Sequence, residues 1–341
     1  QTNAWLDSDM LNEPPTISME LQDLFLSDPM MPSQVGKLVK KDWRKYPPLG
    51  VSLGLIRKGT YSANTRALSF LTLVPEEELK SFQEYQPNNN PLIINQQQSI
   101  LLLYCFLSND GEVVAPLWKK LQEQKNFTDR DAGDLIPDIY RKIINRHQKR
   151  ALSADERDRL QVLEKSAESI LRWKNKSDYA GGAREEASRS RVEPYADIGL
   201  YSKPDPAKYE YTFSKVGQDW VNNLPEIETS EQIRDFLYYS FFSACAAAWK
   251  PFSTPLTDPQ AVLIQLYHAW NKIKSSSDYA PIEEISLLAG INALVDSQRI
   301  INLKTARDIL LAYQKENPYK IRFTVDRLGM LAHVRFIEPP V

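Results

Sequence analysis

The chain has 341 residues, 42% of them apolar and 25% charged, which is the composition of a globular protein of two or three domains. Its formal net charge is only −2, so it is no generic polycation, and any affinity for nucleic acid must come from local basic patches. No apolar run reaches the roughly 18–20 residues that span a bilayer, and no signal peptide opens the sequence. We therefore expect a cytoplasmic protein without a membrane partner.

Residues 1–32 form an acidic segment, because residues 1–31 hold six acidic side chains and no Lys or Arg. Within residues 16–28, apolar side chains from Ile17 to Phe25 recur at helical spacing between two prolines. The pattern predicts a short amphipathic helix. One interpretation is that it binds a partner protein or folds over a basic groove. The alternative is a first helix packed on its own domain.

The charge then changes sign. Lys37, Lys41 and Arg44 lie at positions i, i+4 and i+7, which is one stripe of a helix. A solvated helix face is the usual explanation for such a stripe, and phosphate contact is the alternative. After the stripe, residues 53–70 read LGLIRKGTYSANTRALSF, which predicts a strand, a basic turn, a return strand and a helix.

Most of residues 33–138 is predicted to be helical. Residues 100–107 are apolar on all sides and predict the central helix of a core, followed by a turn at residues 109–111. Helices over residues 113–121 and 128–145 complete the domain.

A long basic segment opens the next domain, residues 139–224. Fourteen basic residues face eight acidic ones between residues 141 and 191, a local balance of +6. One or two long helices are predicted here, with a joint at Ser153, where a capping-box pattern begins. This segment is the best candidate for an electrostatic footprint on nucleic acid.

Residues 184–221 combine several features in one order. A polar segment with arginines precedes the strand pattern DIGLY, and a turn with two prolines precedes the alternating pattern KYEYTFS and a final helix. This order resembles the end of a winged helix-turn-helix domain, where the helix before the strand is the recognition helix and the hairpin is the wing. Residues 53–70 resemble a weaker copy. The resemblance implies a mainly α fold with small β-hairpins (α+β), in which long charged helices join two or three winged-helix-like units.

The same resemblance implies contacts with double-stranded DNA. The helix around residues 184–193 would enter the major groove, and the wing at residues 203–208 would touch the adjacent backbone or minor groove. Two prolines stand where the earlier copy should end its recognition helix, which favours protein binding for that copy. Together with the basic stripe, the predicted nucleic-acid-binding residues are Arg184, Ser188, Arg189, Ser190, Arg191, Lys203, Lys208, Arg57, Lys58, Arg66, Lys37, Lys41 and Arg44.

Residues 225–341 predict a C-terminal helical domain. The strongly apolar residues 233–249 predict a core helix, and a proline-rich connection follows. Further helices are expected over residues 260–273, 281–294 and 305–314. Strands at residues 320–324 and 331–336 predict a final hairpin, which we interpret as a possible third wing.

The sequence offers no pattern for catalysis or metal binding. Its three histidines are scattered, its two cysteines lie in apolar runs, and no zinc, phosphate-loop, nucleophile or nuclease motif occurs. We therefore expect no catalytic residue, no metal and no cofactor.

These observations favour a non-enzymatic protein that binds double-stranded DNA, as a component of a bacterial multi-protein system for defence, partition or a mobile element. Two alternatives stay open. The first is a winged-helix scaffold that binds other proteins and has little affinity for DNA. The second is a nuclease whose active site has an unfamiliar pattern.

Overall fold

The structure, a computed structural model, describes residues 55, 63–74, 94–149, 157, 160–161, 164, 167, 188–189, 191–205, 209–326 and 330–340. Helices hold 63% of these residues and strands 13%, in small and mostly antiparallel sheets, so the predicted mainly α fold is confirmed. The winged-helix units stay a prediction. The acidic segment and the basic stripe lie outside the described residues, as does most of the hairpin predicted within residues 53–62.

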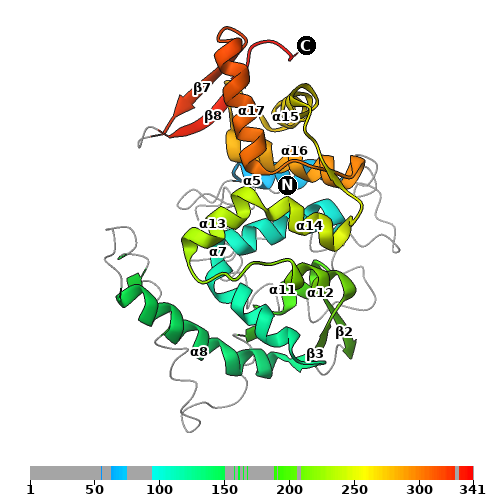
Figure 1. The fold of residues 1–341 in the computed structure, drawn as a ribbon, viewed down its shortest axis with the longest axis vertical. Coiled ribbons are helices and arrows are strands. Elements are labelled where there is room, and N and C mark those ends of the chain that lie inside the picture. The colour runs from blue at the N-terminus through cyan, green and yellow to red at the C-terminus, as the bar shows by residue number, and fades with distance from the viewer. Residues whose placement is uncertain are drawn as a thin grey trace, which may run out of the picture.

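The helix α7 (Gln96–Gln122) runs through the middle of the protein (Figure 1). It begins at a capping box, in which the side chains of Asn95 and Gln98 each accept a hydrogen bond from the other's backbone N–H. Most of its apolar side chains are buried, and Leu117 and Trp118 have no exposed surface. By its length and mean hydropathy of 1.4, α7 alone among the described helices could span a membrane. However, 67% of its most apolar stretch is enclosed by protein, as in a core helix.

Residues Asn109, Asp110 and Gly111 predict a turn, and the structure instead has a kink inside α7. Asp110 takes non-helical backbone angles (φ −129°, ψ 19°), after which the helix resumes. Gly111 lets α13 (Ser230–Tyr239) pack closely, because a Cβ atom there would lie 2.4 Å from Ile233 Cδ1. The kink separates two halves of α7 that pack against different parts of the protein.

The C-terminal half of α7 begins an arrangement that we call unit A, residues 111–213. After α7 it contains β1 (Phe127–Thr128), α8 (Asp129–Gln148), α11 (Glu193–Asp197), β2 (Tyr201–Asp205) and β3 (Glu210–Phe213). The three strands form an antiparallel sheet in the order β1–β3–β2. The aromatic rings of Phe127, Tyr201, Tyr211 and Phe213 pack together on this sheet and are almost completely buried. They hold the hairpin against the helices.

Three helices connect unit A to the C-terminal region: α12 (Lys215–Asn222), α13 and α14 (Phe241–Trp249). The sequence predicted one helix over residues 233–249. The structure has two helices there because Ser240 leaves helical geometry (φ −134°, ψ −9°). α12 packs on α14 and α7, where the rings of Trp118 and Trp220 meet edge to face.

The C-terminal region forms unit B, residues 259–336. It contains α15 (Pro259–Ile273), β5 (Ala280–Pro281), α16 (Ile282–Ser297), α17 (Leu303–Glu316), β7 (Ile321–Val325) and β8 (Leu331–Phe336). The sheet order is β5–β8–β7, with all pairs antiparallel. A short parallel pair, β4 (Thr254–Pro255) with β6 (Arg299–Ile300), flanks the unit. The predicted helices and the predicted final hairpin agree with these elements to within a few residues.

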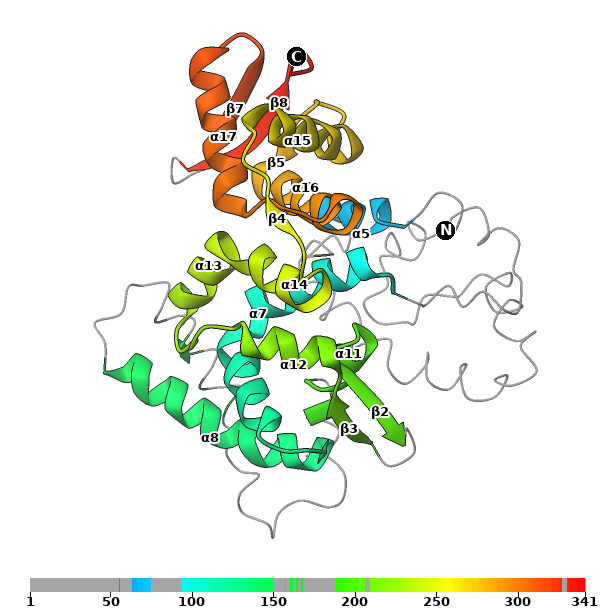
Figure 2. The same cartoon turned by 45° about the vertical axis from the view of Figure 1, so that its right-hand side comes forward.

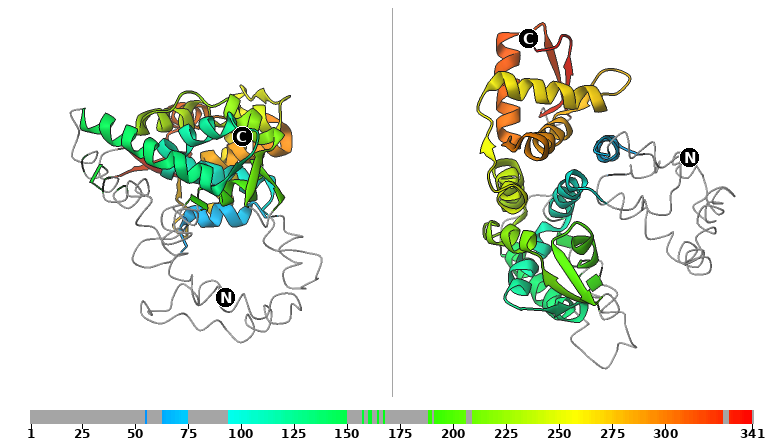
Figure 3. Two further views of the ribbon diagram at one scale, coloured as in Figure 1. Left: turned by 90° about the horizontal axis from the view of Figure 1, so that it is seen from below. Right: turned by 90° about the vertical axis from the view of Figure 1, so that its right-hand side faces the viewer.

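Units A and B share one connectivity. In each, a helix leads to a two-residue strand, a second helix, a later helix and a hairpin. In each sheet, the two-residue strand pairs with the second strand of the hairpin. In the sequence, residues 53–70 resemble residues 198–220 and suggest a repeat. The structural similarity is instead between unit A and unit B, so it pairs the hairpin of unit A with a different part of the chain. The two units lie towards opposite ends of the molecule, with α13 and α14 between them (Figure 2, Figure 3).

The helix α5 (Thr65–Thr72) forms where the sequence predicted one, with the Asn64 side chain capping its first turn. It packs against α15 and α16, and so joins unit B, although it precedes α7 in the chain. The boundary expected between residues 138 and 139 falls inside α8. The packing units of the structure therefore do not follow the order of segments along the chain.

Gly217 provides a test of the packing between the hairpin and α12. A Cβ atom at this position would lie 2.0 Å from the carbonyl oxygen of Leu200, which is backbone and cannot rotate away. We expect Gly217→Ala to lower the free energy of unfolding by about 1–3 kcal/mol, despite the better helix propensity of alanine. Thermal and urea unfolding measure this. Gln218→Ala, at the exposed next residue, is the matched control, and equal stability of the two variants would contradict the packing.

Candidate nucleic-acid interface

The hairpin of unit A begins at a glycine that its geometry requires. Gly199 has a φ of 85°, which L side chains rarely adopt, and it leads the chain from α11 into β2. The N–H of Leu200 closes this turn by donating to the Tyr195 carbonyl at 2.8 Å. After β3, the Ser214 hydroxyl donates to the Gly199 carbonyl and accepts from the N–H of Gly217. These contacts explain the glycine, serine and glycine of the sequence pattern.

Arg189 lies beside this hairpin. Of the three described residues that the sequence assigned to the recognition helix, Ser188, Arg189 and Arg191, it is the most exposed. Its Nε donates to Asp129 Oδ2 at 2.6 Å, and its guanidinium carbon lies 3.6 Å from the ring centre of Tyr209. The side chain keeps 35% of its surface exposed. Tyr209 itself has a φ of 51°, at the point where the wing re-enters the sheet. Arg189 can therefore reach a ligand without unfolding the unit.

Ser188 and Arg191 face inward. The Ser188 side chain is fully buried, and its hydroxyl donates to the Asp129 carbonyl oxygen at 2.6 Å. Arg191 Nε donates to Asp110 Oδ2 at 2.8 Å, and its Nη2 donates to the Tyr140 hydroxyl at 2.8 Å. The structure thus places Arg191 at the kink of α7, where it joins three elements of unit A. In this arrangement Ser188 cannot contact DNA. Arg191 has 21% of its side chain exposed, but its Nε and Nη2 already donate to Asp110 and Tyr140.

Lys203 on β2 shares a carboxylate with Tyr211. Its Nζ and the Tyr211 hydroxyl both donate to Glu193, the first residue of α11. Partial burial raises the pKa of Glu193, but these two hydrogen bonds and the nearby cations hold it below its ordinary value. Burial and the same carboxylate raise the pKa of Tyr211. The Lys203 side chain is partly exposed, and the Glu193 carboxylate compensates its charge.

Arg66 lies away from this cluster. It extends from α5 to α16, where its Nη2 lies 2.7 Å from both Glu283 and Glu284. Tyr104 of α7 donates to Glu283 at 3.1 Å, so the network joins α5, α7 and unit B. The remaining predicted residues lie outside the described part of the chain: Arg184, Ser190, Lys208, Arg57, Lys58, Lys37, Lys41 and Arg44.

The structure adds cations that the sequence did not single out. Lys142 and Lys149 are exposed on α8, and neither has an acidic partner within 4.0 Å among the described residues. Their spacing of seven residues places them on one face of the helix. Lys315 on α17 and Arg322 on β7 are equally exposed and unpaired within the described ranges. In the sequence, Lys142 and Lys149 were visible only as part of the basic balance of residues 141–191, and Lys315 and Arg322 were not singled out.

The described residues hold no group of three or more His, Cys, Asp or Glu side chains that could bind a metal ion. Both cysteines are buried free thiols, and burial raises the pKa of Cys105 to about 12 and that of Cys245 well above its usual value. Neither thiol is placed as a nucleophile.

No protein-family model, no curated protein and no solved structure matches the chain. Function must therefore be argued from the geometry.

Arg189 and Arg191 are two residues apart and have different environments. Arg191→Ala leaves a mostly enclosed Asp110 carboxylate and a buried Tyr140 hydroxyl without their donor, so we expect a loss of about 2–3 kcal/mol in the free energy of unfolding. Arg189→Ala removes a side chain that is 35% exposed and leaves the 7%-exposed Asp129 carboxylate without its cation. Asp129 is the first residue of α8, where the helix dipole favours its charge, and no second donor is lost, so we expect a smaller loss of about 1–2 kcal/mol. Urea unfolding of both variants measures the difference. A larger loss for Arg189→Ala would contradict the assignment.

The lowered pKa of Glu193 makes a prediction about pH. Its contacts stabilise the fold fully above the unfolded-state pKa, and the contribution disappears as pH falls through the folded-state pKa. We expect Glu193→Gln to be less stable than wild type by roughly 1 kcal/mol at pH 7. The difference should shrink on acidification toward pH 3, which thermal unfolding at a series of pH values would show. A constant difference across the series would contradict the role of the carboxylate.

Proposed function

We propose that the chain is a non-enzymatic protein that binds double-stranded DNA. The observation that carries the proposal is the repeated connectivity of units A and B, each of which places a helix before a hairpin. In unit A this helix is the five-residue α11, which begins at Glu193, so the predicted contacts at residues 184–191 precede it in the chain. In winged helix-turn-helix domains, which residues 184–221 resemble, that helix enters the major groove and the hairpin touches the backbone. A biological setting in a bacterial defence, partition or mobile-element system stays a prediction from the sequence.

Local charge supports the proposal. Arg189 is partly exposed beside the hairpin of unit A, and α8 carries the unpaired Lys142 and Lys149. These lysines open the stretch of residues 141–191 in which basic residues exceed acidic ones by six. Exposed cations without acidic partners are the side chains that release counterions from DNA phosphates. The two lysines are therefore our preferred contacts in unit A. The exposed part of the Arg189 guanidinium is a third contact, beside the hairpin, although its Nε already donates to Asp129.

The second candidate function is a scaffold for protein partners. The observation that favours it is the pairing of predicted DNA contacts with the chain's own acids. The pairs are Arg189 with Asp129, Arg191 with Asp110, Lys203 with Glu193, and Arg66 with Glu283 and Glu284. A compensated cation adds little to phosphate attraction, because a competing phosphate must displace the carboxylate. Arg191 and Lys203 then hold unit A together rather than bind a ligand.

Fluorescence anisotropy with a labelled mixed-sequence duplex of about 30 base pairs, in a salt series, tests the proposal. We expect wild type to bind at low salt. Arg189→Ala should weaken binding about tenfold, and the Lys142→Ala/Lys149→Ala pair should do the same while lowering the slope of log K against log salt by about 1.8. Circular dichroism of each variant checks that it stays folded, because Arg189→Ala leaves the buried Asp129 carboxylate without its cation.

Lys272→Ala is the matched control, since it removes one exposed cation from α15 and should leave affinity unchanged. Absence of binding at low salt would contradict the DNA proposal and favour the scaffold. Incubation of supercoiled plasmid with Mg²⁺ tests the non-enzymatic part, and the plasmid should stay intact. Nicking by the purified chain would show a nuclease.

A further inference from the structure

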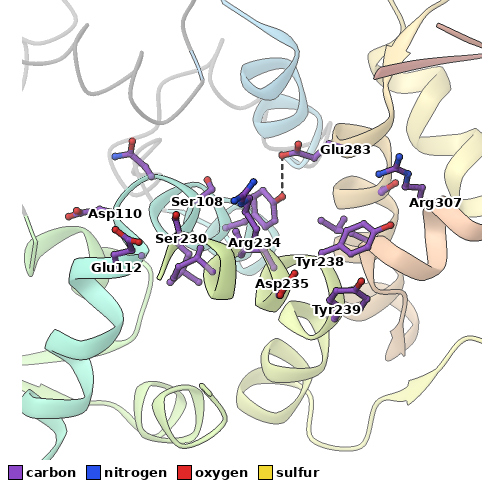
Figure 4. Close-up of a pocket in the computed structure, with 18 of the residues that line it drawn as sticks. Ser108, Asp110, Glu112, Ser230, Arg234, Asp235, Tyr238, Tyr239, Glu283 and Arg307 are labelled. Carbon is purple, nitrogen blue, oxygen red and sulfur yellow. Dashed lines mark hydrogen bonds between the residues drawn. The ribbon is translucent and has the colours of Figure 1, made fainter. Parts of the chain in front are cut away.

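A cleft of about 1110 Å³ opens where α7 is kinked. Its walls come from α7, α13, α16 and α17, with His147 of α8 and with Met330 and Leu331 at the start of β8, so it lies between the two units (Figure 4). Neither the hairpin cluster of unit A nor the exposed lysines of α8 line it. Its role is therefore a separate question from DNA binding.

One half of the cleft is apolar and aromatic. Tyr238 and Tyr239 of α13 line it, as do Met330 and Leu331 of unit B. Tyr239 keeps 49% of its surface exposed, Met330 53%, and Val325 at the same hairpin tip 59%. A group of exposed apolar side chains is unusual on a free surface, and Tyr, Met and Arg are the residue types enriched in protein interfaces. This half has the composition of a protein-binding surface.

The two ends of the cleft carry opposite charge. Arg307 of α17 lies at one end, and it has no acidic partner within 4.0 Å among the described residues. Glu112 lies at the other end, beside His147, whose Nε2 is 3.6 Å from Glu112 Oε2. Asp110 and Glu283 also line the cleft, but Arg191 and Arg66 compensate them. The remaining charges are thus separated along the cleft.

The acidic end also has unsatisfied hydrogen-bonding atoms. Glu112 Oε1 and His147 Nδ1 are buried and have no hydrogen-bond partner in the described structure. His147 is only 7% exposed. Buried polar atoms without partners are rare in folded proteins, and they indicate a missing ligand or water. Between the ends, Arg234 of α13 pairs with Glu231 at 3.6 Å, and Asp235 adds one anion.

We propose that this cleft binds an amphipathic helix from a partner protein. The apolar stripe of that helix lies against Tyr238, Tyr239 and Met330, an Asp or Glu of the helix pairs with Arg307, and a Lys, Arg or amide side chain at its other end donates to Glu112. This is recognition of a helix in a groove, with charge at each end fixing the direction. The acidic segment of this chain, residues 1–31, has no Lys or Arg and complements only one end.

Selection of random phage-displayed peptides of about 16 residues, roughly four helical turns, on the full-length chain tests the proposal. We expect enriched peptides with apolar residues at i, i+3 or i+4 and i+7, an acidic residue near one end and a donor near the other. Tyr239→Ala should weaken a selected peptide at least tenfold. Arg307→Glu should weaken it as well, and a peptide with its acidic residue changed to Lys should restore binding to that variant. A purely structural role of Arg307 would give no such rescue.

Phe252→Ala is the control, because it removes an exposed aromatic ring that does not line the cleft, and it should leave peptide binding unchanged. Circular dichroism melts check that the variants fold. Failure to enrich peptides, or peptides indifferent to both cleft variants, would overturn the proposal. Two further outcomes would also overturn it by naming another occupant. One is tighter binding by a synthetic peptide of residues 14–29. The other is a dimer in light scattering that Tyr239→Ala dissociates.

Discussion

The helix α7 is apolar on almost every side, and the rest of the described structure is arranged to enclose it. A helix without a polar face must be covered by other elements all round. Near its N-terminal end, α7 meets α16 and α14 through Gln97 and Tyr104, and near its C-terminal end it meets α12 through Trp118 and Gln122. Each large buried side chain contributes about 1.5–3 kcal/mol, more than most single ion pairs. Burial of α7 therefore holds unit A, the connecting helices and unit B together.

The kink at Asp110 lets one helix serve both units. Arg191 follows the helical segment at residues 188–189, and its guanidinium reaches Asp110 and Tyr140. The same kink admits α13 at Gly111 and opens the cleft between the units. An ion pair of this kind adds little net stability over an apolar contact, but loss of one partner leaves an enclosed charge. Its main effect is to fix where α7 bends, and hence how the hairpin of unit A stands relative to α13.

The chain has a net charge of only −2 with 86 charged residues, and several of its cations are compensated by nearby acids. Arg66 and Lys203 face carboxylates of the same chain, whereas Lys142 and Lys149 do not. Because screening limits attraction between exposed charges to about 10 Å, only unpaired surface cations act on a distant phosphate. The proposed DNA contacts and the proposed helix-binding cleft therefore occupy different surfaces. The DNA contacts lie on unit A, and the cleft lies at the junction of the two units.

The sequence by itself determined the helical class, the buried helix after residue 100 and both hairpins, since these depend on local periodicity and on residues such as Gly199 and Ser214. It predicted Arg189 and Arg191 as equivalent, because spacing along a helix cannot tell which side chain meets an acid 60 or 81 residues away. The shared connectivity of units A and B also came only from the tertiary structure. Their two-residue strands, Phe127–Thr128 and Ala280–Pro281, are too short to leave a periodic pattern, and they become strands only by pairing with a distant hairpin. Local propensity fixed the elements, and long-range packing decided which charges stay free.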